Sequence, residues 1–185
     1  MTNRTRSSVA VAVGAWILSA CSTPWPRRDP TGERFPSVTA TALDGTLVRV
    51  PEDFAGAPLV LLVGYEQDAQ FDADRWLLGL LQAEVPVAIR ELPTIPGFVP
   101  RLLAGTIDSG MRSGIPDEDW GAVITVYDDA AAVAAFTGNE AGRTMRVLLL
   151  DERGTVAWFH DRGYSAGTLL RLLEALGLRA SGGAR

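Results

Sequence analysis

The side chains that could carry chemistry in this sequence are mostly carboxylates and arginines, and they gather in two stretches. The first stretch follows the apolar run 59–63. Its polar members are Glu66, Gln67, Asp68, Gln70, Asp72 and Arg75. Acidic side chains near the start of a helix are favoured by the helix macrodipole. This cluster is therefore either the solvated start of a helix or a polar rim that binds a partner.

The second stretch covers residues 91–96, 107–112 and 114–120, which use proline, glycine and aspartate heavily. Its charged candidates for binding are Glu91, Asp108, Arg112 and Asp117. In an α/β sheet these segments would follow strands and share an edge with the first stretch. Arg112 could pair with Glu91 or Asp117, or hold a carboxylate or phosphate of a ligand. The alternative is an ordered loop with internal ion pairs.

The sequence predicts neither a metal site nor a bound cofactor. Asp117, Glu118 and Asp119 offer oxygen ligands for a divalent cation, but consecutive residues do not fit an EF-hand loop, so a solvated acidic turn is favoured. His160 is the only histidine and cannot build a multi-histidine zinc site. We expect His160, beside Asp161 and Arg162, to lie on the surface.

Several catalytic classes are excluded by composition. All 17 basic residues are arginine, so there is no lysine for a Schiff base or a Walker-type phosphate loop. No G-x-S-x-G elbow is present. The formal charge of −5 argues against nucleic acid, which needs a basic footprint. Cys21 is the only cysteine, so the chain cannot form an internal disulfide.

The N-terminal residues have the pattern of an export signal. Arg4 and Arg6 precede an apolar run over 9–20 that is short for a bilayer span, and the run ends in Leu-Ser-Ala-Cys21. This ending resembles the lipobox of bacterial lipoproteins, which implies cleavage before Cys21 and acylation of that cysteine. Several acyl chains give stable membrane anchoring. The alternatives are an ordinary secretory signal or a start-anchor helix.

The rest of the chain alternates strand and helix patterns. We expect a hairpin over 38–50 around Asp44-Gly45, a buried strand at 59–63 and a helix at 72–82 with Trp76, Leu77, Leu80 and Leu81 on one face. A strand at 87–91, a helix at 100–112, a strand at 122–127 and a helix at 129–136 follow. A hairpin over 147–159 and a C-terminal helix capped by Ser165 complete the chain. This order indicates an α/β fold with a central mixed sheet flanked by helices and an N-terminal β-hairpin.

The segments "DGTLVRVPEDFAGAPLVLLVGY" and "VLLLDERGTVAWFHDRGY", followed by an amphipathic helix, resemble membrane-tethered thioredoxin-like proteins. The resemblance covers roughly residues 36–178 and implies a thioredoxin-like fold. "RVLLLDERGTVAW" is also similar, more weakly, to thioredoxin-like assembly factors of mitochondrial ATP synthase and their bacterial relatives. That similarity implies a chaperone or assembly role.

Two departures separate this sequence from redox-active thioredoxins. Their Cys-x-x-Cys position corresponds to residues 64–72, which contain no sulfur. Their cis-proline position corresponds to about Met145, where a cis bond without proline would cost about 3 kcal/mol. The resemblance therefore implies a redox-inactive member of the fold.

The sequence thus predicts a signal peptide over 1–20, a lipidated tether over 21–36, a thioredoxin-like domain over 37–178 and a disordered tail over 179–185. The mature domain would face the periplasm or the cell exterior. Its lipid anchor would lie in the outer membrane if the cell has two membranes. We expect it to bind a protein partner in envelope assembly, without catalytic residues. A hydrolase or transferase using Glu66, Glu91 and Asp117 with Arg112 stays open as an alternative, as does capture of a small anionic ligand.

Overall fold

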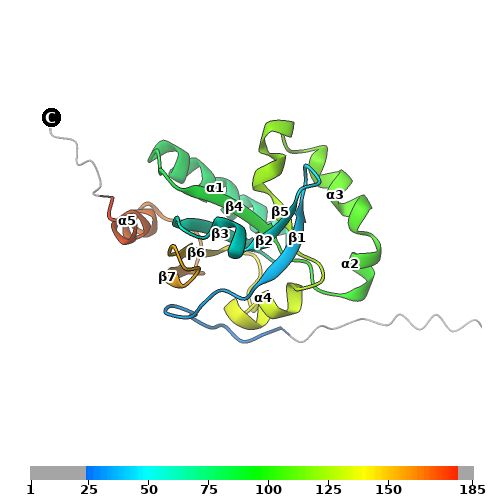
Figure 1. Cartoon of the computed structure of the whole chain (residues 1–185), viewed down its shortest axis with the longest axis horizontal. Coiled ribbons are helices and arrows are strands. Elements are labelled where there is room, and N and C mark those ends of the chain that lie inside the picture. Colours follow the sequence, from blue (N-terminus) through cyan, green and yellow to red (C-terminus); the bar gives the residue numbers. More distant parts are fainter. Residues whose placement is uncertain (1–23, 179–185) are drawn as a thin grey trace, which may run out of the picture.

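The computed structural model describes residues 24–178 (Figure 1). The predicted signal peptide, the lipidation site Cys21 and the predicted tail over 179–185 lie outside these residues. The described chain contains these strands: β1 (Val38–Ala42), β2 (Leu47–Val50), β3 (Leu59–Gly64), β4 (Ala88–Pro93), β5 (Ile124–Thr125), β6 (Arg146–Leu150) and β7 (Val156–His160). Its α-helices are α1 (Gln70–Gln82), α2 (Phe98–Leu102), α3 (Ala104–Arg112), α4 (Ala130–Thr137) and α5 (Ala166–Ala175). Its 3-10 helices are η1 (Glu52–Phe54), η2 (Gln67–Ala69) and η3 (Asp117–Ala122).

The strands form a mixed central sheet and a smaller sheet beside it. The central sheet has the order β4-β3-β6-β7, with β3 parallel to β4 and antiparallel to β6. The smaller sheet has the order β2-β1-β5. Parallel bridges from Glu91 to Val123 and from Thr94 to Val126 join β4 to the chain around β5. The predicted fold class is therefore confirmed, including its N-terminal hairpin.

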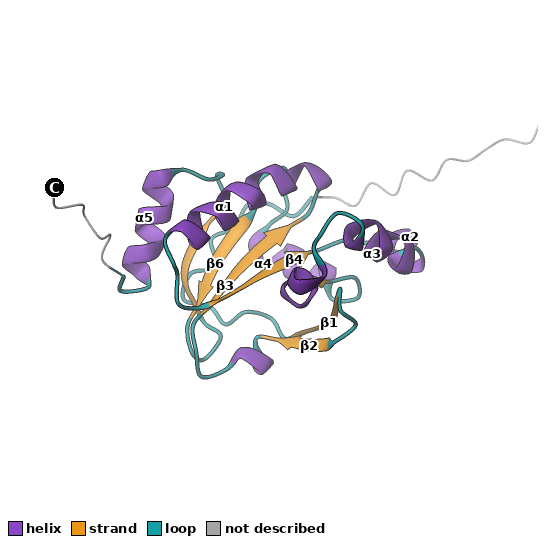
Figure 2. Cartoon of the chain, turned by 90° about the horizontal axis from the view of Figure 1, so that it is seen from above, coloured by secondary structure: helices purple, strands orange, loops and turns teal. Residues whose placement is uncertain are grey.

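The central sheet is buried on both faces. Alternate residues of β3 enter two different hydrophobic clusters: Leu59, Leu61 and Val63 pack with the smaller sheet and α4, whereas Val60 and Leu62 pack under α1 and α5. Figure 2 shows α1 and α5 together on one side of the sheet. This two-sided burial explains why the run 59–63 is continuously apolar.

The two predicted hairpins form at their turn residues. In the first, the Thr46 N–H donates to Asp44 Oδ1 at 2.8 Å, and Gly45 adopts φ +92°, which glycine tolerates. β6 and β7 make the second hairpin, with a register shift between Leu149 and Leu150. Ser165 caps α5 by accepting the Thr168 N–H at 3.1 Å, as its position predicts.

Two predicted elements differ from the structure. The expected single helix over 100–112 is two helices, because Leu103 leaves helical geometry and its N–H closes a turn onto Pro100. The expected strand over 122–127 is reduced to the two residues of β5. Its other residues pair with β4, so the run is divided between the two sheets. In α1, Leu81 is 68% exposed and does not join the buried face.

Residues 24–36, the described part of the predicted tether, lie along the domain. The N–H groups of Gly32 and Phe35 donate to the carbonyls of Val156 and Gly154, and Val156 N–H donates back to Glu33. The Phe35 ring is 1% exposed and packs edge-on against Phe136. We call residues 24–36 the strap. Proline and charge favour extended chain here, but the extended chain is used to pair with the start of β7.

No helix within residues 24–178 is both long and apolar enough to cross a membrane.

Candidate functional site

The loop that follows β3 presents an exposed set of charges. Glu66 precedes η2, and Asp68 lies within it. Both carboxylates face Arg143, with N–O distances of 4.0 Å to Glu66 and 3.6 Å to Asp68. All three side chains are more than half exposed. We call Glu66, Gln67, Asp68 and Arg143 the polar edge.

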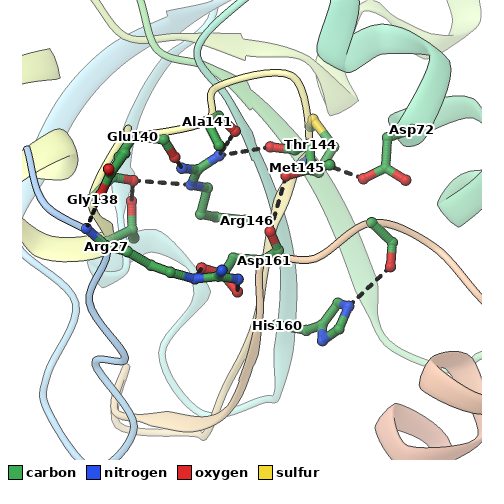
Figure 3. Close-up of polar contacts among 12 residues, drawn as sticks. Arg27, Asp72, Gly138, Glu140, Ala141, Thr144, Met145, Arg146, His160 and Asp161 are labelled. Carbon is green, nitrogen blue, oxygen red and sulfur yellow. Dashed lines mark hydrogen bonds and ion pairs between the residues drawn. The ribbon is translucent and has the colours of Figure 1, made fainter. Parts of the chain in front are cut away.

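Arg143 belongs to a loop, residues 138–145, that is organised around a buried guanidinium (Figure 3). Arg146 is 1% exposed and donates to the carbonyls of Gly138 (2.9 Å), Ala141 (3.1 Å), Thr144 (2.8 Å) and Glu140. Desolvation lowers the pKa of Arg146. Its charge is balanced by carbonyl dipoles, and these bonds fix the loop that carries Arg143.

Tyr65 connects the two loops beneath the polar edge. The Arg146 guanidinium lies over its ring at 5.3 Å, and its hydroxyl is 2.6 Å from Thr137 Oγ1. Burial raises the pKa of Tyr65 to about 12. The phenol is therefore protonated at neutral pH and cannot act as a general base there. Tyr65 supports the site from below and does not form its rim.

Asp72, a member of the predicted polar cluster, is structural. It is 6% exposed, and its carboxylate accepts the N–H of Met145 at 3.0 Å and the N–H of Tyr164 at 2.7 Å. One side chain of α1 thus joins the start of β6 to the chain entering α5. The other predicted members of this cluster are exposed: Glu66, Gln67, Asp68 and Arg75. Arg75 lies on α1 and forms no ion pair with a described residue, so it does not join the polar edge.

Met145 occupies the position predicted to lack a cis peptide. The one cis peptide bond within residues 24–178 joins Val50 to Pro51, so the bond before Met145 is trans. The Met145 side chain is 3% exposed and lies against Gly64 at the end of β3. A buried thioether therefore sits under the loop, where it is not reactive toward disulfides.

The second predicted stretch does not converge on a ligand site. Arg112 donates from Nε to the Leu43 carbonyl at 2.6 Å, and its guanidinium lies 5.7 Å from the Trp120 ring. It forms no ion pair with Glu91 or Asp117 in the described structure, so that predicted pairing is wrong. Arg112 holds the tip of the first hairpin against η3. Asp117 is exposed in the first turn of η3.

Asp108 and Glu91 each have local partners of their own. Asp108 accepts the Tyr127 hydroxyl at 2.8 Å, which raises the pKa of that phenol together with burial. Glu91 lies on β4, and its pKa is raised mainly by desolvation, with smaller contributions from Asp74 and Asp119, while hydrogen bonding from Gln70 lowers it. Neither Glu66 nor Asp117 is among the groups that shift the pKa of Glu91.

The sequence predicted His160 to lie on the surface, but the residue is partly buried in an aromatic cluster. Its ring stacks on Trp158 with centroids 5.8 Å apart, and it lies 6.0 Å from the buried Trp76. Its Nε2 is 2.9 Å from the Gly163 carbonyl. His160 therefore closes an aromatic cluster between β7 and α1.

No group of three His, Cys, Asp or Glu side chains suited to a metal ion occurs within residues 24–178. Two surface hollows of about 320 and 330 Å³ lie elsewhere, one beside Phe54 and Pro86, the other beside Arg27 and Arg162. Neither is lined by the polar edge or by Glu91, Arg112 or Asp117. The structure thus gathers only part of the predicted site: Glu66, Gln67 and Asp68.

Arg143 and Arg146 were not among the predicted site residues. Arg146 had one usable signal, because a charge at the head of the fully buried strand "RVLLL" demands buried partners. Arg143 had none, since its pairing with Glu66 and Asp68 depends on how the loop 138–145 folds back.

Comparisons of the sequence with models of protein families and with curated proteins give no match. Solved structures do match. Yeast Sco1 with copper bound has a TM-score of 0.57 at 11% identity, covering 85% of this chain and 99% of that one. The thioredoxin domain of a thiol-disulfide oxidoreductase from Bacteroides vulgatus has a TM-score of 0.53 at 15% identity, covering 80% and 99%. The pneumococcal exposed lipoprotein thioredoxin from Streptococcus pneumoniae has a TM-score of 0.51 at 10% identity, covering 75% and 98%. At these identities the likeness concerns architecture, and it shows that the chain has a thioredoxin-like fold.

Proposed function

We propose that this chain is a membrane-tethered, redox-inactive thioredoxin-fold lipoprotein that binds a protein partner in the cell envelope, as an assembly or chaperone factor. The observation that carries the proposal is the polar edge. At the loop where redox-active thioredoxins hold their cysteines, this protein presents the exposed charges Glu66, Asp68 and Arg143. Arg143 lies on the loop 138–145, whose carbonyls Arg146 binds, and Tyr65 contacts Arg146 from the end of β3.

A rigid platform with exposed charges suits protein recognition. Exposed ion pairs add little to stability, about 0 to 1 kcal/mol each, so the fold does not depend on them. The same charges can steer and orient a partner of complementary charge. The anchoring rests on the resemblance of residues 18–21 to a lipobox and on the apolar run before them.

No observation favours the rival functions. A carboxylate hydrolase needs converging groups in a cleft, and neither of the two hollows is lined by Glu66, Glu91, Asp117 or Arg112. For capture of an anionic ligand, Arg112 lines neither of the two hollows, and its Nε holds the Leu43 carbonyl. Yeast Sco1 is described with copper bound, but within residues 24–178 there is no cysteine, one histidine and no group of three His, Cys, Asp or Glu side chains suited to a metal ion.

The anchor is tested by labelling with a radioactive fatty acid in a bacterium that processes lipoproteins. The wild-type chain is expected to take up label and to stay with the membrane after a high-salt wash. Cys21→Ser should take up no label. Continued labelling of Cys21→Ser would contradict the anchor.

The binding role is tested by charge reversal at the polar edge. A chain with Glu66→Arg and Asp68→Arg is expected to melt close to wild type but to fail to complement a deletion strain. The matched control is Glu174→Arg on α5, an exposed acid remote in sequence from the polar edge. If both variants complement normally at wild-type stability, the polar edge is not the functional surface.

A further inference from the structure

The strap is fixed to the domain almost from its first described residue. The Trp25 N–H donates to Asn139 Oδ1 at 2.6 Å, and the Trp25 carbonyl accepts the N–H groups of Asn139 (3.2 Å) and Glu140 (3.1 Å). Two residues later, Arg27 makes a two-pronged ion pair with Asp161 (Figure 3). Residue 25 is therefore a fixed point on the surface of the domain.

Gly138 makes this close crossing possible. It adopts φ +70°, and a Cβ there would lie 2.9 Å from the Cα of Arg27 and closer still to the Pro26 carbonyl. A glycine is needed both for the backbone conformation and for the space. The sequence thus encodes contact between the strap and the loop 138–145, the loop that carries Arg143.

The fixed point sets how far the domain can stand from the residue proposed to carry lipid. Trp25 lies four positions after Cys21. A fully extended chain spans at most about 3.6 Å per position, or roughly 14 Å in all. This is less than half the thickness of a hydrocarbon core, about 30 Å. Resting on the proposed lipidation of Cys21, we infer that the face around Trp25 docks on the surface of the lipid bilayer that holds the anchor.

The chemistry of this face suits a lipid surface. Trp25 is 47% exposed, and tryptophan is favoured at the interface between headgroups and hydrocarbon. Beside it lies the hollow of about 330 Å³, whose charged lining residues are Arg27, Arg28, Arg162, Asp29 and Asp161. Arg27 pairs with Asp161 and Arg28 pairs with Glu33, so the side chain of this face that suits a lipid surface is Trp25.

Docking would also place the polar edge next to the membrane. Trp25 contacts Asn139 and Glu140, and the same loop continues to Gly142, where a Cβ would lie 2.6 Å from Glu66 Oε1. The strap, the loop and the polar edge form one continuous surface. A partner recognised by the polar edge would therefore meet the domain at the membrane surface.

The test uses the full lipidated chain, purified in detergent and reconstituted into vesicles of phosphatidylcholine and phosphatidylglycerol. The acyl chains are brominated near the headgroup, so they quench only tryptophans at the interface. We expect the vesicles to quench the wild-type fluorescence and the Trp25→Phe variant to lose most of that quenching. Trp76, Trp120 and Trp158 remain in the variant as an internal reference.

A spacer variant separates docking from anchoring. About twelve Gly/Ser residues inserted after Thr23 add roughly 20 Å of flexible reach, which should abolish the quenching while the chain still floats with the vesicles. Equal quenching in wild type and Trp25→Phe, in chains that float, would overturn the docking and leave the anchor standing. A wild-type chain that does not float would instead overturn the proposed anchor, and the docking with it.

Discussion

At the scale of single residues, carboxylates that stand close together in the sequence have opposite roles. Glu66 and Asp72 are six residues apart. Glu66 is exposed and its carboxylate faces Arg143, whereas Asp72 is buried and accepts two backbone N–H groups from distant segments. Both side chains are carboxylates, so residue type does not distinguish their roles. What distinguishes them is burial and where their hydrogen-bond and ion-pair partners lie.

Asp72→Ala is expected to destabilise the protein strongly. It leaves the N–H groups of Met145 and Tyr164 buried without an acceptor, and each unsatisfied group costs about 1 to 3 kcal/mol. A loss of roughly 2 to 4 kcal/mol in the free energy of unfolding should appear in urea titrations. Asp68→Ala, in the adjoining exposed loop, is the control and should lose less than about 1 kcal/mol. A loss no larger than that of the control would mean that Asp72 does not join the three segments.

Glu91→Gln is expected to stabilise the protein at neutral pH. Since desolvation raises the pKa of Glu91 in the folded state, the folded protein holds this proton more tightly than the unfolded chain does. The stability from this group is complete below the ordinary glutamate pKa of 4.5 and is lost as the pH rises through the raised pKa. Removing the charge should raise the Tm at pH 7 by roughly 2 to 4 °C, the effect of about 1 kcal/mol in a domain of this size.

The pH dependence distinguishes this effect from a general one. The difference in Tm between Glu91→Gln and wild type should shrink toward zero as the pH falls below 4.5. Glu118→Gln, an exposed change in η3, should leave the Tm unaltered across the range. If Glu91→Gln still has a higher Tm than wild type at pH 4, the ionised carboxylate of Glu91 is not the cause of the difference.

At the scale of elements, the strap and the loop 138–145 act as one unit. Gly138→Ala is expected to displace the strap, because the new Cβ would clash with the backbone of Pro26 and Arg27. Hydrogen exchange at the amides of Asn139 and Glu140, which donate to Trp25, should accelerate at least about tenfold, as a loss of about 1.4 kcal/mol in protection implies. The control is Gly105→Ala in α3, where a Cβ meets no atom within 4 Å. Unchanged exchange in Gly138→Ala would show that the strap is not held by this contact.

Elements with a periodic pattern were the ones that the sequence predicted well. The leucine stripe of α5, the apolar run of β3 and the Asp44-Gly45 turn carry local signals, and each element forms there. The strap shows no hydrophobic periodicity in its sequence, because backbone hydrogen bonds to β7 and ion pairs hold it in place. The run 122–127 was predicted as one strand because its burial is continuous, but two sheets share it.

The candidate site was predictable only where exposure followed from local position. Residues 66–68 come directly after a buried strand and before a helix, so their place at a sheet edge could be inferred. The prediction for Arg112 failed because its actual partners are the Leu43 carbonyl and the Trp120 ring. Both come from segments whose approach to Arg112 depends on tertiary packing. A charged side chain in a loop has many possible partners, and sequence spacing does not choose among them.

At the scale of the whole molecule, the fold is retained without the sulfur chemistry of redox-active thioredoxins. Thiol-disulfide exchange requires a thiolate, and residues 22–185 contain no cysteine. If Cys21 is acylated, as we propose, it supplies no thiol either. The loop after β3 nevertheless forms one turn over residues 66–69, because the Ala69 N–H donates to the Glu66 carbonyl at 3.0 Å.

The purified lipidated chain is therefore expected to reduce insulin disulfides at the background rate. A double variant, Glu66→Cys with Ala69→Cys, places a Cys-x-x-Cys on that turn and serves as the matched control. Ala69 is 1% exposed and Glu66 is exposed, so the outer thiol is accessible and the inner one is sheltered. Since attack needs only an accessible thiolate with a second thiol to resolve the mixed disulfide, this variant should exceed the background rate. Inactivity of the wild type then comes from missing sulfur and not from a collapsed loop. Wild-type activity above background, in protein freed of contaminating oxidoreductases, would contradict a redox-inactive role and reopen catalysis at the polar edge.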